Sequence, residues 1–261
     1  MAHKIYDNFV LENEIEDQYN SLLDLAQFCT VDNSLTGTPG MVKKINVYSA
    51  TDGTEKLAMG AGNTKNIEVD YTPEEYRILM AQNRFKYFDE QEMTDPMIVT
   101  TGIRHMAVDM FNTVNADVFA EFNKATLEHT SSAPDFGCFA DAAALLNVEN
   151  IEGLGLFAFV NPKDMAKVRK ALKDELKYVE AFAKSGYVGT IAGWNLYTKK
   201  DAVENTIVGG TREAVTLFNK RGTEVEQARN EDIRENTIWS RKYYLAALTD
   251  ATKAVKITLG A

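Results

Sequence analysis

Three histidines are the only imidazoles that this sequence offers for acid–base or metal chemistry, and they are scattered. His3 lies near the N-terminus, His105 in a predicted helix and His129 in a predicted polar loop. His105 precedes Asp109 by four residues, a spacing that predicts a solvent-exposed i,i+4 pair. Nucleophilic catalysis needs a nucleophile, a base and an orienting group together, and no such set surrounds these histidines. We therefore predict no catalytic residue, no metal site and no enzymatic activity.

Paired carboxylates occur at Glu74-Glu75, Asp89-Glu90 and Glu231-Asp232, and each pair could serve as acid and base or as metal ligands. Their expected positions at strand ends favour a solvated surface instead. Gly153-Leu154-Gly155 precedes a predicted strand and does not open a helix, so it lacks the geometry of a phosphate-binding loop. We predict no cofactor.

Composition restricts the class further. The chain has 261 residues, is 45% hydrophobic and carries a formal net charge of −10, so it can bury a core in one large or two modest domains. The acidic balance argues against a duplex-binding protein, which needs a concentrated basic face. Cys29 and Cys138 form no CxxC pair, which favours reduced thiols. No run approaches the roughly 20 apolar residues that span a bilayer, so we predict a cytoplasmic protein without a membrane segment.

The N-terminal third predicts an arm and a projecting ribbon. Ile15, Tyr19, Leu22 and Ala26 share one face of a helix predicted over Glu14 to Cys29, within the acidic segment Met1 to Asn33. Two alternating runs, Val42 to Ser49 and Ile67 to Tyr71, then flank a Gly-rich polar stretch. They predict a two-stranded hairpin about 30 Å long, which is marginal alone in water and needs a partner surface. An edge hairpin on its own subunit is the alternative.

A long helix follows an extended stretch from Tyr76 to Glu92. Asp95-Pro96 supplies a helix start, and apolar residues then recur every three or four positions to about Lys124. At 1.5 Å per residue this helix is about 40 Å long, and we interpret it as a structural spine. The apolar positions are Ile103, Met106, Met110, Val114, Val118 and Phe122.

The second half mixes helices and strands, which makes the predicted class α+β. A loop is expected from Leu127 to Gly137, a short helix from Phe139 to Asn147, and a buried strand from Leu154 to Val160. Asn161-Pro162 caps the next helix, which is predicted to end at Ser185-Gly186 with Met165, Val168, Leu172, Leu176 and Val179 inside. The remaining strands are predicted over Tyr187 to Ile191, Trp194 to Thr198, Thr206 to Val208, Ala214 to Phe218, Ile238 to Ala247 and Ala254 to Leu259.

The helix after Asn161-Pro162 carries a stripe of lysines that could attract an anionic partner. Acidic residues are mixed into this stripe, which favours a solvated face. The lysines are Lys163, Lys167, Lys170, Lys173 and Lys177, and the acidic residues are Asp164, Asp174 and Glu175.

The order of these elements resembles the major capsid proteins of tailed bacteriophages, whose fold is shared with encapsulins. Three short stretches of sequence add to this resemblance. GLFAFVNPKDMAKVRKAL resembles a strand, Asn-Pro turn and helix of that family, and SGYVGTIAGWNLYTKK resembles the strand pair after it. NTIWSRKYYLAALTDATKAVKIT resembles the long return strand and the final axial strand. The resemblance implies an N-terminal arm (1–35), an extended loop (42–72) on the adjacent subunit, a peripheral domain (36–41, 73–130 and 223–248) and an axial domain (131–222 and 249–261).

The resemblance also implies what this protein assembles with. It implies self-assembly in the bacterial host cytoplasm into a virion shell of hexamers and pentamers around double-stranded DNA that is not bound sequence-specifically, with a portal and decoration proteins as further partners. The acidic charge suits a wall along which packed DNA slides. The sequence has no room before the arm for the cleaved scaffolding domain of some members, which implies a separate scaffolding protein or a mature product; the initial Met argues against processing. Lys56 and Lys65 are candidates for the isopeptide cross-links of other members, although no carboxylate neighbour is identified.

Two alternatives stay open. An encapsulin-type nanocompartment would enclose a protein cargo in a smaller shell. A cytosolic α+β enzyme or anion-binding module, using the lysine-rich helix, would stay monomeric at high concentration.

Overall fold

The computed structural model describes residues 23–147, 155–173 and 189–260. The first half contains η1 (Leu25–Phe28), β1 (Thr30–Asp32), β2 (Val42–Ala50), β3 (Val69–Arg77), β4 (Leu79–Phe88), α2 (Asp89–Thr94), α3 (Met97–Phe122), β5 (Leu127–Ser131) and α4 (Phe136–Leu145). The second half contains β6 (Leu156–Val160), α5 (Pro162–Ala171), β7 (Thr190–Ile191), β8 (Trp194–Thr198), β9 (Thr206–Gly210), β10 (Val215–Asn230), β11 (Glu235–Leu248), η3 (Ala251–Lys253) and β12 (Ala254–Leu259). The predicted α+β class is confirmed.

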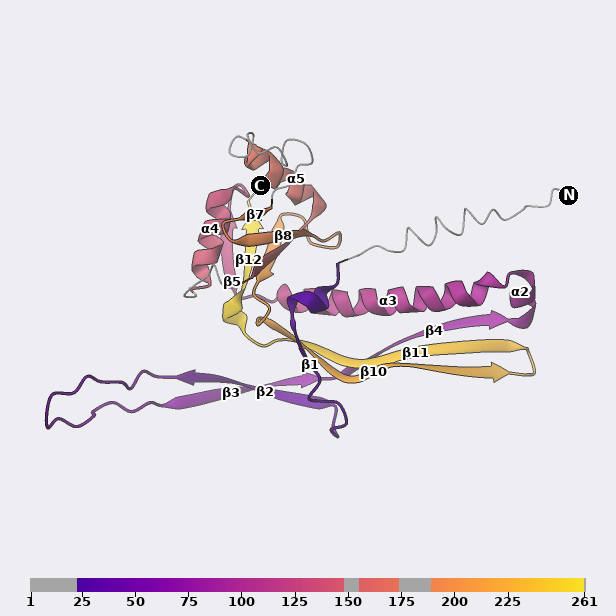
Figure 1. The fold of residues 1–261 in the computed structure, drawn as a ribbon, viewed down its shortest axis with the longest axis horizontal. Helices are drawn as coiled ribbons and strands as arrows, with labels where there is room; N and C mark the ends of the chain where they lie inside the picture. The colour runs from indigo at the N-terminus through magenta and orange to yellow at the C-terminus, as the bar shows by residue number, and fades with distance from the viewer. Residues whose placement is uncertain (1–22, 148–154, 174–188, 261) are drawn as a thin grey trace.

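Three bodies follow one another in space (Figure 1). A head holds a six-stranded sheet in the order β5-β12-β9-β6-β8-β7 with α4 and α5 beside it. The second, elongated body consists of α3, which lies along the four-stranded sheet β1-β10-β11-β4. The hairpin β2-β3 projects in the direction opposite to the far end of α3, so the molecule is extended on both sides.

The spine helix begins at Met97, as the sequence predicts, and ends at Phe122, two residues before the predicted end. The Asp95 carboxylate accepts a hydrogen bond from the backbone N of Met97 (3.0 Å), which satisfies one of the free N–H groups of the first turn. Gly102 lies against the Phe85 ring of β4, where a Cβ would stand 2.5 Å from ring carbons, so only glycine allows this close approach. The helix therefore leans on the β4 side of its sheet.

The head is built around the apolar strand β6, whose five residues are all buried. The Asn161 side chain accepts from the backbone N of Lys163 and Pro162 follows it, so α5 begins as predicted. Gly209 of β9 lies so close to Phe157 and Trp194 that a Cβ would be 2.3 Å from the Phe157 carbonyl oxygen. The Trp194 indole N–H donates to the Phe139 carbonyl (2.9 Å) and ties α4 to the sheet.

Four predicted elements differ from the structure. Residues 14–22 of the helix predicted to Cys29 lie outside the described residues, and Leu25–Phe28 forms a 3-10 helix capped by Asp24 that ends at extended Cys29. The stretch predicted as extended to Glu92 turns into α2 at Asp89, where the Gln91 side-chain oxygen accepts a hydrogen bond from the backbone N of Phe88 (3.0 Å). The sequence predicted as a loop after Leu127 contains β5, which is stabilised by parallel pairing with β12.

The fourth difference is the length of β10, which continues beyond the predicted Phe218 to Asn230. Most of the additional residues are polar, with Val225 and Ala228 as exceptions, and their strand is held by antiparallel pairing with β11. Ion pairs of Arg241 with Glu224 and Glu226 cross between the two strands.

The helix predicted to Gly186 is described only to residue 173, and its remainder lies outside the described residues.

Candidate assembly surfaces

The projecting ribbon is the most exposed part of the described chain. β2 and β3 pair in register from Val42 opposite Arg77 to Ala50 opposite Val69. The predicted hairpin is present, but its second strand covers Val69–Arg77 where the sequence predicts Ile67 to Tyr71. One face carries Tyr48 opposite Tyr71, with ring centroids 6.1 Å apart and side chains 65% and 62% exposed. An aromatic pair that is this exposed loses hydrophobic stabilisation unless another surface covers it. The ribbon thus presents an uncovered apolar face.

Polar contacts along the ribbon hold its own two strands together. The ammonium of Lys44 lies 2.6 Å from the Glu75 carboxylate, and this hydrogen-bonded cation holds the pKa of Glu75 below its ordinary value. Towards the tip, the Glu55 carboxylate accepts from both the hydroxyl and the backbone N of Thr64, which lowers the Glu55 pKa. Met59 is fully exposed at the tip. At its base the ribbon also contacts the long sheet, because Lys43 lies over the Phe218 ring and the Tyr76 hydroxyl donates to the Leu248 carbonyl (3.4 Å). Beyond this base, Tyr48, Val69 and Tyr71 are exposed.

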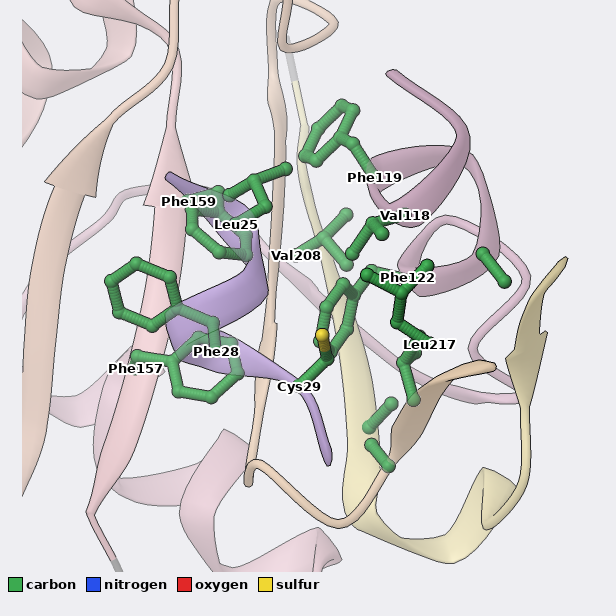
Figure 2. Packing of buried hydrophobic residues seen from close by; sticks show 14 of the residues in the cluster. Leu25, Phe28, Cys29, Val118, Phe119, Phe122, Phe157, Phe159, Val208 and Leu217 are labelled. Carbon is green, nitrogen blue, oxygen red and sulfur yellow. The ribbon is translucent and has the colours of Figure 1, made fainter. Parts of the chain in front are cut away.

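Residues that the sequence places in the arm form part of the subunit's own core. Leu25, Phe28 and Cys29 are buried between α3 and the head sheet (Figure 2). The Phe28 ring lies 4.9 Å from Phe157, 5.3 Å from Phe159 and 4.6 Å from Tyr197. β1 then pairs in parallel with β10, with Thr30 opposite Thr216. Burial raises the pKa of the Cys29 thiol to about 11, so this cysteine is a poor nucleophile.

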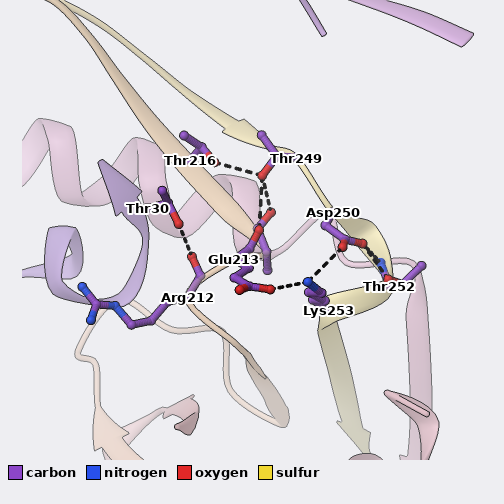
Figure 3. A network of polar contacts seen from close by, with 9 residues as sticks. Thr30, Arg212, Glu213, Thr216, Thr249, Asp250, Thr252 and Lys253 are labelled. Carbon is purple, nitrogen blue, oxygen red and sulfur yellow. Dashed lines mark hydrogen bonds and ion pairs between the residues drawn. The ribbon is translucent and has the colours of Figure 1, made fainter. Parts of the chain in front are cut away.

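A polar network joins the head to the long sheet (Figure 3). The backbone N atoms of Thr249 and Asp250 both donate to the Ala214 carbonyl, at 2.9 and 3.1 Å. The hydroxyls of Thr216 and Thr249 are 3.0 Å apart, and Lys253 pairs with Glu213 and Asp250. These contacts fix the angle at which the chain passes from β11 into β12.

The far end of the long sheet carries a second set of ion pairs. Arg229 contacts Asp89 at 2.8 Å and Glu231 at 2.9 Å, and the Asn236 amide donates to Asp89 (2.7 Å). Arg234 contacts Glu90 at 2.8 Å. The turn between β10 and β11 is thereby tied to α2. Together with the Lys44–Glu75 ion pair of the ribbon, these contacts show that all three predicted carboxylate pairs take part in structural contacts.

The structure separates most of the residues singled out for chemistry. His3 lies outside the described residues, while His129 stands in β5 opposite Ile257 and not in a loop. The predicted pair of His105 with Asp109 is not among the ion pairs of the described residues; the Asp109 carboxylate accepts from the Asn83 amide at 3.2 Å. Glu74-Glu75 lies inside β3 and not at a strand end. Among the described residues, no group of three or more His, Cys, Asp or Glu is close enough to hold a metal ion.

Two lysines of the lysine-rich helix α5 are paired within the subunit. Lys163 contacts Glu204 at 2.8 Å, and Lys167 contacts the fully buried Asp164 at 2.8 Å. Asp164 also accepts from the backbone N of Asn205 (2.7 Å). Lys177 lies outside the described residues.

Cys29 and Cys138 are free and buried, in agreement with the prediction of reduced thiols. No helix in the described part of the chain is long and apolar enough to cross a membrane.

An elongated sheet with a parallel spine helix, a compact α/β head and a free ribbon is the architecture of the tailed-phage capsid fold. Solved capsids share it over most of the chain: the mature capsid of bacteriophage PhiM1 superposes with a TM-score of 0.73 at 10% identity, covering 92% of this chain and 87% of that one. The capsid of cyanophage P-SCSP1u gives 0.72 at 12% identity, covering 89% and 86%.

The sequence itself is 25% identical over 258 residues to the major capsid protein of Staphylococcus phage phiMR11, covering 96% of this chain and 92% of that protein. A virus-like particle from Pyrococcus furiosus shares the fold with a TM-score of 0.60 at 13% identity, covering 94% and 96%. No protein-family model matches the chain. The predicted resemblance to tailed-phage major capsid proteins is confirmed.

Proposed function

We propose that this chain is the structural major capsid protein of a tailed phage or prophage, which self-assembles into an icosahedral shell of hexamers and pentamers. The observation that carries this proposal is the ribbon β2-β3, whose exposed Tyr48, Val69 and Tyr71 have no cover on their own subunit. On a subunit with the capsid fold, a second copy of the chain is the surface that covers them. Many modest contacts of this kind sum to a stable particle once the shell closes.

The divisions implied by the resemblance are part of this proposal. The N-terminal arm comprises 1–35, the extended loop comprises 42–72, the peripheral domain comprises 36–41, 73–130 and 223–248, and the axial domain comprises 131–222 and 249–261. Double-stranded DNA inside the shell, a separate scaffolding protein, a portal and decoration proteins are the proposed partners. The role is structural, and we propose no catalytic step.

An encapsulin-type compartment is the second candidate, supported by the archaeal virus-like particle that shares the fold. The phage shells superpose more closely, and the similar full-length sequence is a phage capsid protein. Electron microscopy of purified particles separates the two candidates: genome-sized heads that retain nuclease-protected DNA support the phage shell, whereas small closed particles holding protein support the compartment.

Deletion of Thr51 to Lys65 tests the role of the ribbon. Ala50 and Val69 are paired, so the deletion leaves the three residues 66–68 as the loop, a length that hairpins accept. We expect a folded subunit, with an unchanged far-ultraviolet circular dichroism signal per residue, that forms no particles in electron micrographs. A matched control replaces the same fifteen residues by a flexible Gly/Ser segment, which keeps the loop's length but removes its side chains. Unchanged particle yield from the deletion variant would falsify the proposed role of the ribbon.

A further inference from the structure

The spine helix α3 has two apolar faces, and only one of them is covered. Met106, Met110 and Val118 are buried against the sheet and head. Ile103, Ala107 and Phe111 stand four residues apart on another face, and the large side chains Ile103 and Phe111 are 48% and 37% exposed. A second apolar stripe on a helix indicates that a further element packs there.

This exposed stripe forms one wall of a groove of about 410 Å³. Val225 of β10 and Ile238 of β11 lie on the opposite wall, and Lys242 stands on its rim. The groove exists because α3 leans on β4 through Gly102 and Phe85, which leaves β10 uncovered beside it. Asp24 and Ala26 close one end. The groove therefore ends at the point where the described chain begins.

Two hydrogen bonds fix the direction from which the preceding residues arrive. The Asn115 amide donates to the Leu23 carbonyl (3.1 Å), and its oxygen accepts from the backbone N of Leu25 (3.0 Å). Asn115 is 3% exposed, so this anchor is buried. It sets residue 23 beside residue 115, an offset of 92 along the sequence.

The apolar residues before Leu23 repeat the spacing of the exposed stripe at this same offset. Leu11, Ile15, Tyr19 and Leu22 are separated by four, four and three residues, as are Ile103, Ala107 and Phe111 of the exposed stripe and the buried Val114 that lines the groove beyond them. Two helices that start from one anchor and run in the same direction rise equally per residue, so each apolar residue of the first meets one of the second. Residues 11–22 would span about 18 Å, the length of α3 between Ile103 and Asn115.

We propose that residues 11–22 occupy this groove of their own chain as a helix parallel to α3, with residue i beside residue i+92. Leu11, Ile15, Tyr19 and Leu22 cover the exposed stripe. The acidic residues Glu14, Glu16 and Asp17 remain at the surface near Lys242. The segment then packs on α3 of its own subunit and covers apolar side chains of that helix. This packing does not depend on whether the chain forms shells.

A disulfide experiment tests both the occupant and its register. The double variant Tyr19→Cys with Phe111→Cys should form an intrachain disulfide under mild oxidation. On non-reducing gels the monomer band should then shift in mobility, and no band at the mass of a dimer should appear. Tyr19→Cys with Ile103→Cys is the matched control, because its partners are offset by about 12 Å along the axis and should stay reduced. Disulfide-linked dimers would show that a second copy fills the groove, and equal oxidation in both variants would show that the segment has no register; either result overturns the proposal.

Proteolysis gives an independent readout. Phe111→Glu places a charge on the exposed stripe, so the segment should leave the groove and a glutamate-specific protease should cut at Glu12, Glu14 and Glu16 at least tenfold faster than in the unaltered chain. Val203→Glu changes an apolar residue of the head that is 62% exposed and should leave the rate unchanged. Both substitutions are at the surface, so circular dichroism should show retained folding. Equal cleavage of the three proteins would contradict the docked segment.

Discussion

Phe28 provides the sharpest test of how this subunit is held together, because it connects the N-terminal segment to the head. Its ring contacts Phe157 and Phe159 of β6 and Tyr197 of β8, and it is 8% exposed. Phe28→Ala removes a buried ring and leaves a cavity between rigid strands. Substitutions of this kind cost about 3–5 kcal/mol, and the three ring contacts favour the upper part of that range because each contributes about 0.5–1.5 kcal/mol beyond its buried area.

Urea unfolding of dissociated subunits measures this cost. Trp194 is fully buried in the head, so tryptophan fluorescence reports the loss of the core. With a slope near the upper end of the usual 1–3 kcal/mol per molar urea, the unfolding midpoint should fall by about 1–2 M. Phe136→Ala is the matched control, because that phenylalanine is 51% exposed and its truncation should move the midpoint by less than about 0.3 M. Equal midpoints for the two variants would mean that the residues after 23 are a loosely attached arm.

Two further changes test the long sheet and its helix. Val114→Asp places an unpartnered carboxylate at a buried position of α3 and should cost more than about 3 kcal/mol, so soluble expression should be lost; recovery of particles from this variant would contradict the spine assignment. The Lys86 ammonium, 2.6 Å from Glu235, holds the pKa of that carboxyl below its ordinary value, so its stabilising contribution is present at neutral pH and is lost as the pH falls through the lowered pKa. Lys86→Met should raise the Glu235 pKa in a carboxyl-detected NMR titration, and an unchanged titration would show that the pair does not form.

Elements with strong local signals were predictable from the sequence. The spacing from Ile103 to Phe122, with Asp95-Pro96 before it, fixes α3 to within two residues of its observed end. The run before Asn161-Pro162 is apolar throughout because β6 is buried on both faces. The alternation on both sides of the glycine-rich tip predicts a hairpin, although its second strand continues six residues beyond the predicted Tyr71 to Arg77.

Elements that depend on distant partners were not predictable in this way. Leu25, Phe28 and Cys29 read as the end of an amphipathic helix, and only the aromatic residues of β6, more than a hundred positions later, show that they belong to the core. The outer half of β10 is polar and includes Gly222, so its strand character comes from β11 and from Arg241. His129 looked like a loop residue because the strand that pairs with it, β12, lies 128 residues further on.

The position of β12 in the head has a consequence for synthesis of the protein. β12 lies between β5 and β9, so the strand order of the six-stranded sheet is interrupted until residues 254–259 have left the ribosome. The parallel pairing of β1 with β10 is likewise formed late, since residue 30 waits for residue 216. A nascent chain therefore keeps an open head until β12 has left the ribosome and can pair with β5 and β9.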